Sequence, residues 1–158
     1  MNRVLPESAS NKYQFSPVIV CFFWVIASIT IVRSLIHMLA ADGGANSIAG
    51  IVIFSGTPDP NQVLYFAFSL WGLSQLLMGI FYIIVVFRYR NLIPLMLLFL
   101  SFEYSMRMVL GKFLKPLSDA YFTGTVPGEI GNYILLPLAL VLFTWAIAGP
   151  LKPKTKNM

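Results

Sequence analysis

Charge is scarce in this chain of 158 residues: lysine, arginine, aspartate and glutamate together make up 11% of it. A soluble domain carries about 25% charged residues, whereas 58% of this chain is hydrophobic and its mean hydropathy is +0.77. So few charges cannot solvate the surface of a 17.7 kDa globule. The composition therefore excludes a water-soluble protein, a disordered chain and a nucleic-acid-binding module, despite a net charge of +5.

Cysteine and histidine each occur once, as Cys21 and His37. A single cysteine excludes an intramolecular disulfide, a thiol redox pair and a zinc site built from cysteines. One histidine and one carboxylate within the apolar segments, Glu103, cannot supply the three protein ligands of a catalytic metal site. Neither a phosphate-binding glycine loop nor a plausible Ser–His–Asp grouping is present. The sequence therefore predicts no catalytic residue, metal or cofactor, and it disfavours an enzyme.

Long apolar runs are abundant, and a helix needs about 20 such residues to cross a bilayer core. Four segments fit or nearly fit this length: residues 17–41, 63–87, 92–114 and 133–148. The fourth is the shortest and carries Pro137 in its first turns, where proline is tolerated. Asn132 is placed to cap it. The sequence predicts an all-α membrane protein, an antiparallel four-helix transmembrane bundle forming one domain over residues 1–158.

Basic residues gather on one side of this predicted bundle. The N-terminal segment, the turn between the second and third spans, and the tail over residues 149–158 share that side, and they carry Arg3, Lys12, Arg88, Arg90, Lys152, Lys154 and Lys156. The two other loops hold acidic residues, and Lys112 and Lys115 are the bases nearest to them. By the positive-inside rule, we expect both termini of this inner-membrane protein in the cytoplasm. The apolar run of the first span is longer than that of a cleaved signal peptide, so we expect this span to be a permanent anchor.

The first outer loop, residues 42–62, contains an apolar run from Ile48 to Phe54 that is too short to cross the membrane. Turn-forming sequences flank this run, with Asp-Gly-Gly before it and Thr-Pro-Asp-Pro after it. We expect the run to lie at the membrane interface or to pack over the mouth of the bundle.

Charged residues interrupt two of the spans: Arg33 in the first, and Glu103 and Arg107 in the third. Such a charge costs about 3 kcal/mol at the bilayer centre and normally faces the bundle interior with a partner. Arg33 and His37 share a helix face, as do Glu103 and Arg107, because each pair is four residues apart. At 1.5 Å per residue both pairs fall in the outer half of the bilayer, with Glu103 near the middle.

Gln75 lies at a similar depth on the second span, on one face with Gly72 and Gly79, which would let another backbone approach closely. We expect Glu103 to accept hydrogen bonds from Arg33, Arg107 or both, with His37 and Gln75 completing the set. The alternatives are structural: an Arg–Glu pair that fixes helix register, a hydrogen-bonding histidine at a helix end, and lysines at 112 and 115 that extend to the headgroups.

The cluster has an excess of positive charge, because Arg33, Arg107, Lys112 and Lys115 face one intramembrane carboxylate. Unless Asp42 and Asp119 neutralise this excess, the site suits an anionic group. The sequence thus predicts a non-enzymatic protein that binds a lipid or amphiphilic anion in a polar pocket of the outer leaflet. The predicted ligand-binding residues are Arg33, His37, Gln75, Glu103, Arg107 and Lys112.

Two other function classes stay open. The first alternative is an accessory subunit of a homo-oligomer or a larger membrane complex. It is favoured because so little of the chain lies outside the spans. A channel or transporter is disfavoured because the inner half of every span is nearly continuous apolar sequence. Membrane lipids are the expected partners, and nucleic acid is not.

Several short stretches resemble small four-span inner-membrane proteins of bacteria. They are residues 88–96 (Arg-Tyr-Arg-Asn-Leu-Ile-Pro-Leu-Met), 102–107 (Phe-Glu-Tyr-Ser-Met-Arg), 111–112, 115–116, and Thr-Val-Pro-Gly at 125–128 through Gly-Asn-Tyr at 131–133. In size and span count the chain is also similar to the DoxX-like four-helix group. These resemblances imply a four-helix inner-membrane protein, and they transfer no functional residue.

Overall fold

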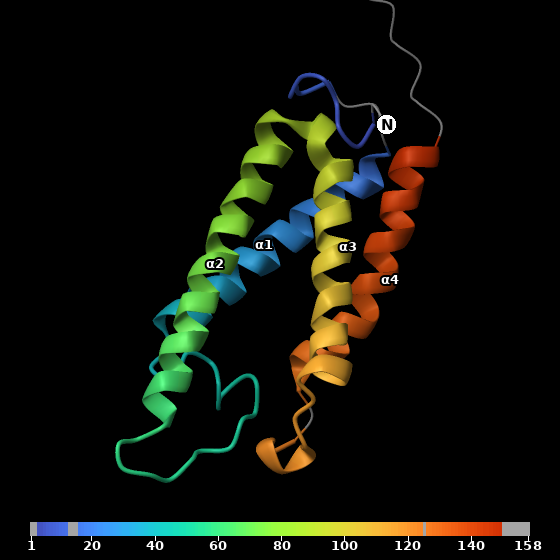
Figure 1. The fold of residues 1–158 in the computed structure, drawn as a ribbon. Helices are drawn as coiled ribbons and strands as arrows, with labels where there is room; N and C mark the ends of the chain where they lie inside the picture. Colours follow the sequence, from blue (N-terminus) through green and yellow to red (C-terminus); the bar gives the residue numbers. More distant parts are fainter. Residues whose placement is uncertain (1–2, 13–15, 125, 150–158) are drawn as a thin grey trace, which may run out of the picture.

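The computed structural model describes residues 3–12, 16–124 and 126–149. They form four long helices, α1 (Pro17–Leu39), α2 (Asn61–Arg88), α3 (Ile93–Val109) and α4 (Pro127–Ala148) (Figure 1). A 3-10 turn (Arg90–Leu92) precedes α3, a π-helical turn (Leu110–Leu114) extends it, and a second 3-10 turn (Asp119–Tyr121) lies in the following loop. Each of the four spans is long and apolar enough to cross a membrane. The all-α, four-helix architecture predicted from the sequence is confirmed, and the chain is a multi-pass membrane protein.

The helices pair as two hairpins. α1 packs along α2 and α3 packs along α4, whereas α2 and α3 make few close contacts. In Figure 1, α2 and α3 lie near each other at the turn that joins them and diverge toward their opposite ends. We call the end of the bundle that holds this turn, with Arg88 and Arg90, the basic end, and the opposite end the loop end.

The apolar core lies in the half of the bundle near the basic end. It is built from the start of α1 and α3 and the end of α2 and α4, and its buried members are Ile19, Phe23, Ile26, Ala27, Tyr82, Val85, Val86, Ile93, Met96, Leu97, Leu100, Tyr104, Ala139, Leu142 and Ala146. Because the two hairpins share this core, apolar packing holds them together at the basic end. Toward the loop end, contacts of another kind join them.

The N-terminal segment lies across the basic end. The guanidinium of Arg3 donates to the carbonyl oxygens of Ile147 at 2.8 Å and Gly149 at 2.7 Å, and so caps the end of α4. The side chain of Asn91 accepts from the amide of Ser10 and donates to the carbonyl of Ser8, each at 2.8 Å. The start of the chain therefore meets the end of α4 on one side of the bundle. Of the predicted basic tail, residues 150–158 lie outside the described part of the chain.

The fourth helix begins earlier than predicted, at Pro127 instead of residue 133. Pro127 occupies the first helical position, where its fixed φ suits the helix and its missing N–H has no partner to lose. Asn132 is therefore inside the helix and does not cap it, and Pro137 lies in the helix interior. Gly128 and Gly131 also lie within α4.

The apolar run of the first outer loop pairs with the second outer loop. Ile51 and Phe122 form an isolated antiparallel bridge. The amide of Val52 donates to the carbonyl oxygen of Tyr121 at 3.0 Å, and the amide of Thr123 donates to the carbonyl oxygen of Gly50 at 2.7 Å. This loop bridge, residues 50–52 with 121–123, connects the two hairpins at the loop end.

Candidate functional site

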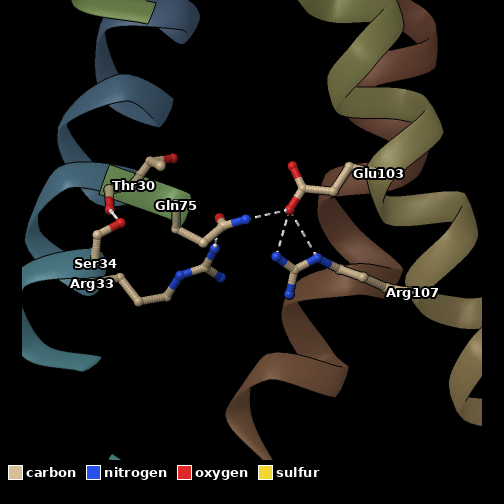
Figure 2. Close-up of polar contacts among 6 residues, drawn as sticks. All are labelled: Thr30, Arg33, Ser34, Gln75, Glu103 and Arg107. Atoms are coloured by element: carbon tan, nitrogen blue, oxygen red, sulfur yellow. Dashed lines mark hydrogen bonds and ion pairs between the residues drawn. The ribbon is translucent and has the colours of Figure 1, made fainter. Parts of the chain in front are cut away.

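Four side chains from three helices form a continuous chain of hydrogen bonds that we call the polar relay: Arg33, Gln75, Glu103 and Arg107 (Figure 2). Arg33 Nη2 donates to Gln75 Oε1 at 2.9 Å, and Gln75 Nε2 donates to Glu103 Oε1 at 3.0 Å. Arg107 Nε and Nη2 donate to the same carboxylate oxygen at 3.1 and 2.5 Å. The relay therefore crosses from the first hairpin to the second through one glutamine amide.

Two glycines on α2 set the position of Gln75 against α1. A Cβ on Gly72 would lie 2.8 Å from the backbone nitrogen of Met38, and a Cβ on Gly79 would lie 2.8 Å from Ile31 Cδ1. The helices approach closely at both positions because neither residue has a side chain. Gln75 lies between the two glycines on the same face, and it meets Arg33 at this close approach. The glycine-lined face predicted from the sequence is present.

Trp71 provides an aromatic surface that both arginines share. The guanidinium carbon of Arg33 lies 5.6 Å from the ring centroid of Trp71, and that of Arg107 lies 5.1 Å from it. Arg107 also lies 5.7 Å from the ring of Tyr104. These distances are within the range of cation–π attraction. Trp71 is not among the site residues predicted from the sequence, although its position four residues before Gln75 places both on one helix face.

The relay leaves hydrogen-bonding capacity unused. Arg33 Nε is buried and has no hydrogen-bond partner among the described residues. The donors to Glu103 among the described residues all reach Oε1, and in Figure 2 its second oxygen points away from them. The side chains of Arg107 and Glu103 remain 21% and 28% exposed. Two guanidiniums face one carboxylate, so the relay carries a net charge of about +1 at neutral pH.

His37 lies outside the relay, and the expectation that it completes the hydrogen bonds around Glu103 is wrong. Its side chain is buried, and Nδ1 lies 2.7 Å from the carbonyl oxygen of Gly43. The chain turns back after α1 with Gly43 at a φ of +59°, which brings that carbonyl onto the ring. The ring centroids of His37 and Trp71 lie 4.7 Å apart. This contact favours the structural alternative, a histidine that fixes the loop against α2.

Lys112 is also separate from the relay. It lies in the π-helical turn after α3, and its Nζ is 3.7 Å from Glu129 Oε1 and 5.0 Å from the ring centroid of Tyr133. The side chains of Lys112 and Glu129 are 45% and 57% exposed. The structure therefore brings four of the six predicted site residues together and places His37 and Lys112 elsewhere.

Asp42 does not neutralise the arginines, because backbone amides occupy its carboxylate. It accepts from the amides of Gly44, Asn46 and Ser47 at 2.8, 3.1 and 2.7 Å. Desolvation raises the pKa of Asp42, but these hydrogen bonds outweigh it and lower the pKa from 3.8 to about 2. Asp42, in the loop after α1, thus organises its own loop and does not compensate the charge of the relay.

The donor set of the relay suits anion binding more than bond-making chemistry. Guanidinium groups donate in a fixed planar fork that matches carboxylate and phosphate oxygens. Within residues 3–12, 16–124 and 126–149, no three His, Cys, Asp or Glu side chains come together as a metal site. Ser34, next to Arg33, donates to the carbonyl of Thr30 in its own helix (Figure 2). The arrangement can therefore hold an anion through positive charge and N–H donors.

The likeness to small bacterial membrane proteins and to the DoxX-like group concerns short stretches and overall layout, and it stays a prediction. Comparison with known proteins finds no family model that matches this chain, and no curated protein or solved structure that is similar to it.

Proposed function

We propose that this protein is a non-enzymatic membrane protein that binds a lipid or amphiphilic anion at the polar relay. The observation that carries the proposal is the partly exposed Glu103–Arg107 pair within a membrane-spanning helix. A charge exposed to acyl chains is unfavourable by several kcal/mol, so a polar group must cover this pair. An anionic headgroup would supply the acceptor atoms that the arginine donors lack.

The surroundings of the relay support an amphiphile more than a free ion. Arg107 lies about 21 Å along α3 from Ile93, at 1.5 Å per residue. On the side of the relay that faces the bilayer centre, Phe99 and Phe102 of α3 are 45% and 65% exposed. An amphiphile can place its headgroup at the relay and its chain along this apolar surface, and both contacts then contribute to binding.

The distribution of bases supports a location for the site. Arg3, Arg88 and Arg90 lie at the basic end, and the positive-inside rule assigns such an end to the cytoplasm. In a bacterial inner membrane both termini would then be cytoplasmic, and the relay, which lies toward the loop end, would open to the outer leaflet.

Native mass spectrometry of the protein extracted from its membranes in mild detergent tests the proposal. We expect the wild type to retain one anionic lipid or amphiphile per chain, and Arg33→Gln to lose at least 90% of it. Lys115→Gln is the matched control, because it removes one exposed positive charge outside the relay. A wild type without an adduct, or an equal adduct in Arg33→Gln, would refute the proposal.

The second candidate function is that of an accessory subunit in a membrane complex or homo-oligomer. It is favoured by the large apolar side chains that α4 leaves exposed, among them Ile134 at 59% and Val141 at 60%. The same extract distinguishes the two functions. A second polypeptide in fixed stoichiometry, or a discrete oligomer, together with the absence of a lipid adduct would favour the subunit.

A further inference from the structure

We infer that the relay selects a headgroup with a single negative charge, and that Arg33, not Arg107, is the residue that holds it. This inference rests on the proposed function and narrows the class of ligand. It depends on how the two positive charges of the relay are distributed over their acceptors.

The charge of Arg107 is already matched. Two of its nitrogens donate to Glu103 Oε1 at 3.1 and 2.5 Å. The two residues are four apart on α3, so the helix itself holds this pair together. A guanidinium that is hydrogen-bonded twice to a carboxylate carries little unmatched charge, because the pair is neutral as a unit.

The charge of Arg33 is not matched. It donates to the neutral amide oxygen of Gln75 at 2.9 Å and interacts with the neutral hydroxyl of Tyr104, and its Nε is buried without a partner among the described residues. The sequence of α1 contains no aspartate or glutamate. The excess charge of the relay therefore belongs to Arg33, beside an N–H that has no acceptor.

A monoanion fits this charge best. A phosphodiester or a carboxylate would bring the relay to net zero, whereas a dianion would leave an excess negative charge near Glu103 in a medium of low dielectric constant. A choline or ethanolamine headgroup is disfavoured, because its cation would compete with the two guanidiniums for the face of Trp71 and with Arg107 for Glu103. A headgroup hydroxyl, in contrast, could donate to the second oxygen of Glu103.

The substitution Glu103→Gln separates charge from shape. Glutamine has nearly the same shape and keeps an acceptor for Gln75 and Arg107, but it raises the net charge of the relay from about +1 to about +2. If charge matching determines selectivity, this variant must prefer a doubly charged headgroup.

The experiment is a lipid titration of the full-length protein in neutral detergent at pH 8, read by native mass spectrometry. The probes are phosphatidylglycerol, phosphatidate and phosphatidylcholine with identical acyl chains; a phosphomonoester such as phosphatidate is close to doubly charged at this pH. We expect the wild type to bind one phosphatidylglycerol at least tenfold more tightly than the other two lipids. We expect Glu103→Gln to prefer phosphatidate, and Arg33→Gln to bind phosphatidylglycerol at least tenfold more weakly.

Lys115→Gln is the control for loss of one exposed charge, and it should bind the three lipids in the same order of affinity as the wild type. If Arg33→Gln fails to fold, the lipid preference of Glu103→Gln alone tests the inference. Competition with oleate identifies the source of the monoanion: displacement of phosphatidylglycerol assigns a carboxylate, and failure to displace it assigns a phosphodiester. Equal binding of phosphatidate by the wild type, or an unchanged order in Glu103→Gln, would overturn the inference. Absence of any lipid from the wild type would instead remove the proposed function.

Discussion

At the scale of single residues, Gln75 combines two functions that few side chains can combine. Its carbonyl oxygen accepts from Arg33 while its N–H donates to Glu103. An amide provides both a donor and an acceptor, whereas a carboxylate offers acceptors alone and leucine offers neither. One neutral side chain thereby links an arginine of the first hairpin to the ion pair of the second.

Removal of this amide should destabilise the fold. We expect Gln75→Leu to lower the free energy of unfolding by about 1–3 kcal/mol, because it leaves Arg33 and Glu103 each with one hydrogen bond fewer. Thermal unfolding in detergent, followed by circular dichroism, measures the effect. Ser74→Ala is the control, since Ser74 lies on the exposed face and bonds within its own helix. Equal melting temperatures for Gln75→Leu and the wild type would contradict this role.

Gly72 should not tolerate a methyl group. Its added Cβ would lie 2.8 Å from the Met38 nitrogen and 2.9 Å from His37 Cβ, and the backbone at this contact cannot move aside cheaply. We expect Gly72→Ala to lower the melting temperature. The control is Gly131→Ala in α4, where nothing lies within 4 Å of an added Cβ and alanine should be neutral or stabilising by up to about 1 kcal/mol. Equal effects of the two substitutions would exclude close packing as the reason for glycine at position 72.

Four members of the candidate site could be predicted because an intramembrane charge has few acceptable positions: it must face inward and find a partner. Depth and helix face were therefore enough for Arg33, Gln75, Glu103 and Arg107. The same reasoning failed for His37, because it ignored the backbone. A carbonyl in the turn after α1 reaches the imidazole first, and no side-chain pattern encodes that contact.

At the scale of elements, the positions of the helices follow from long apolar runs, but the start of α4 does not. Gly128 and Gly131 are typical of loops, and they concealed the proline that starts the helix. The loop bridge was equally hidden, because its hydrogen bonds join backbone groups of segments that are distant in sequence. Backbone pairing of this kind leaves no signature in residue type.

The turn after α1 should respond to acid through Asp42. Its pKa in the folded protein is about 2, below the ordinary value of 3.8. A depressed pKa means that the ionised carboxylate stabilises the folded state above about pH 4, and that this stabilisation is lost as the pH falls toward 2. We expect Asp42→Asn to weaken the decline in melting temperature between pH 4 and pH 2. Asp119→Asn, which removes an exposed carboxylate from the other loop, should leave the decline as it is in the wild type.

The loop bridge should be close enough to cross-link. Opposed residues of an antiparallel pair have Cα atoms about 4.5–5.5 Å apart, within the range that a disulfide spans. We expect Ile51→Cys combined with Phe122→Cys, in a Cys21→Ser background, to form an intramolecular disulfide on mild oxidation. Faster migration on a non-reducing gel reports the disulfide, and the two single-cysteine variants are the controls. A double variant that remains reduced would show that the loops do not pair.

At the scale of the whole molecule, the two hairpins are joined at three levels. The apolar core holds them at the basic end, the Gln75–Glu103 hydrogen bond holds them at mid-length, and the loop bridge holds them at the loop end. The packed core supplies most of the burial, so the contacts nearer the loop end can change with less loss of stability. A ligand at the relay would act on this less tightly packed half.

The proposed orientation predicts which cysteines a membrane-impermeant maleimide can reach. In a Cys21→Ser background, we expect Ser55→Cys in the first outer loop to react in intact cells. Ser8→Cys, at the basic end, should react after the membrane is disrupted. The reverse order of labelling would place the basic end outside and would remove the argument for an outer-leaflet site.

The division of the relay between the hairpins has a consequence for how the chain is inserted during synthesis. Arg33 and Gln75 both belong to the first hairpin, and Glu103 and Arg107 both belong to α3. Each charged side chain can therefore gain a hydrogen-bonding partner from its own hairpin before the two hairpins join. The late step is then the joining of a neutral Glu103–Arg107 pair to an Arg33–Gln75 pair that still carries one positive charge.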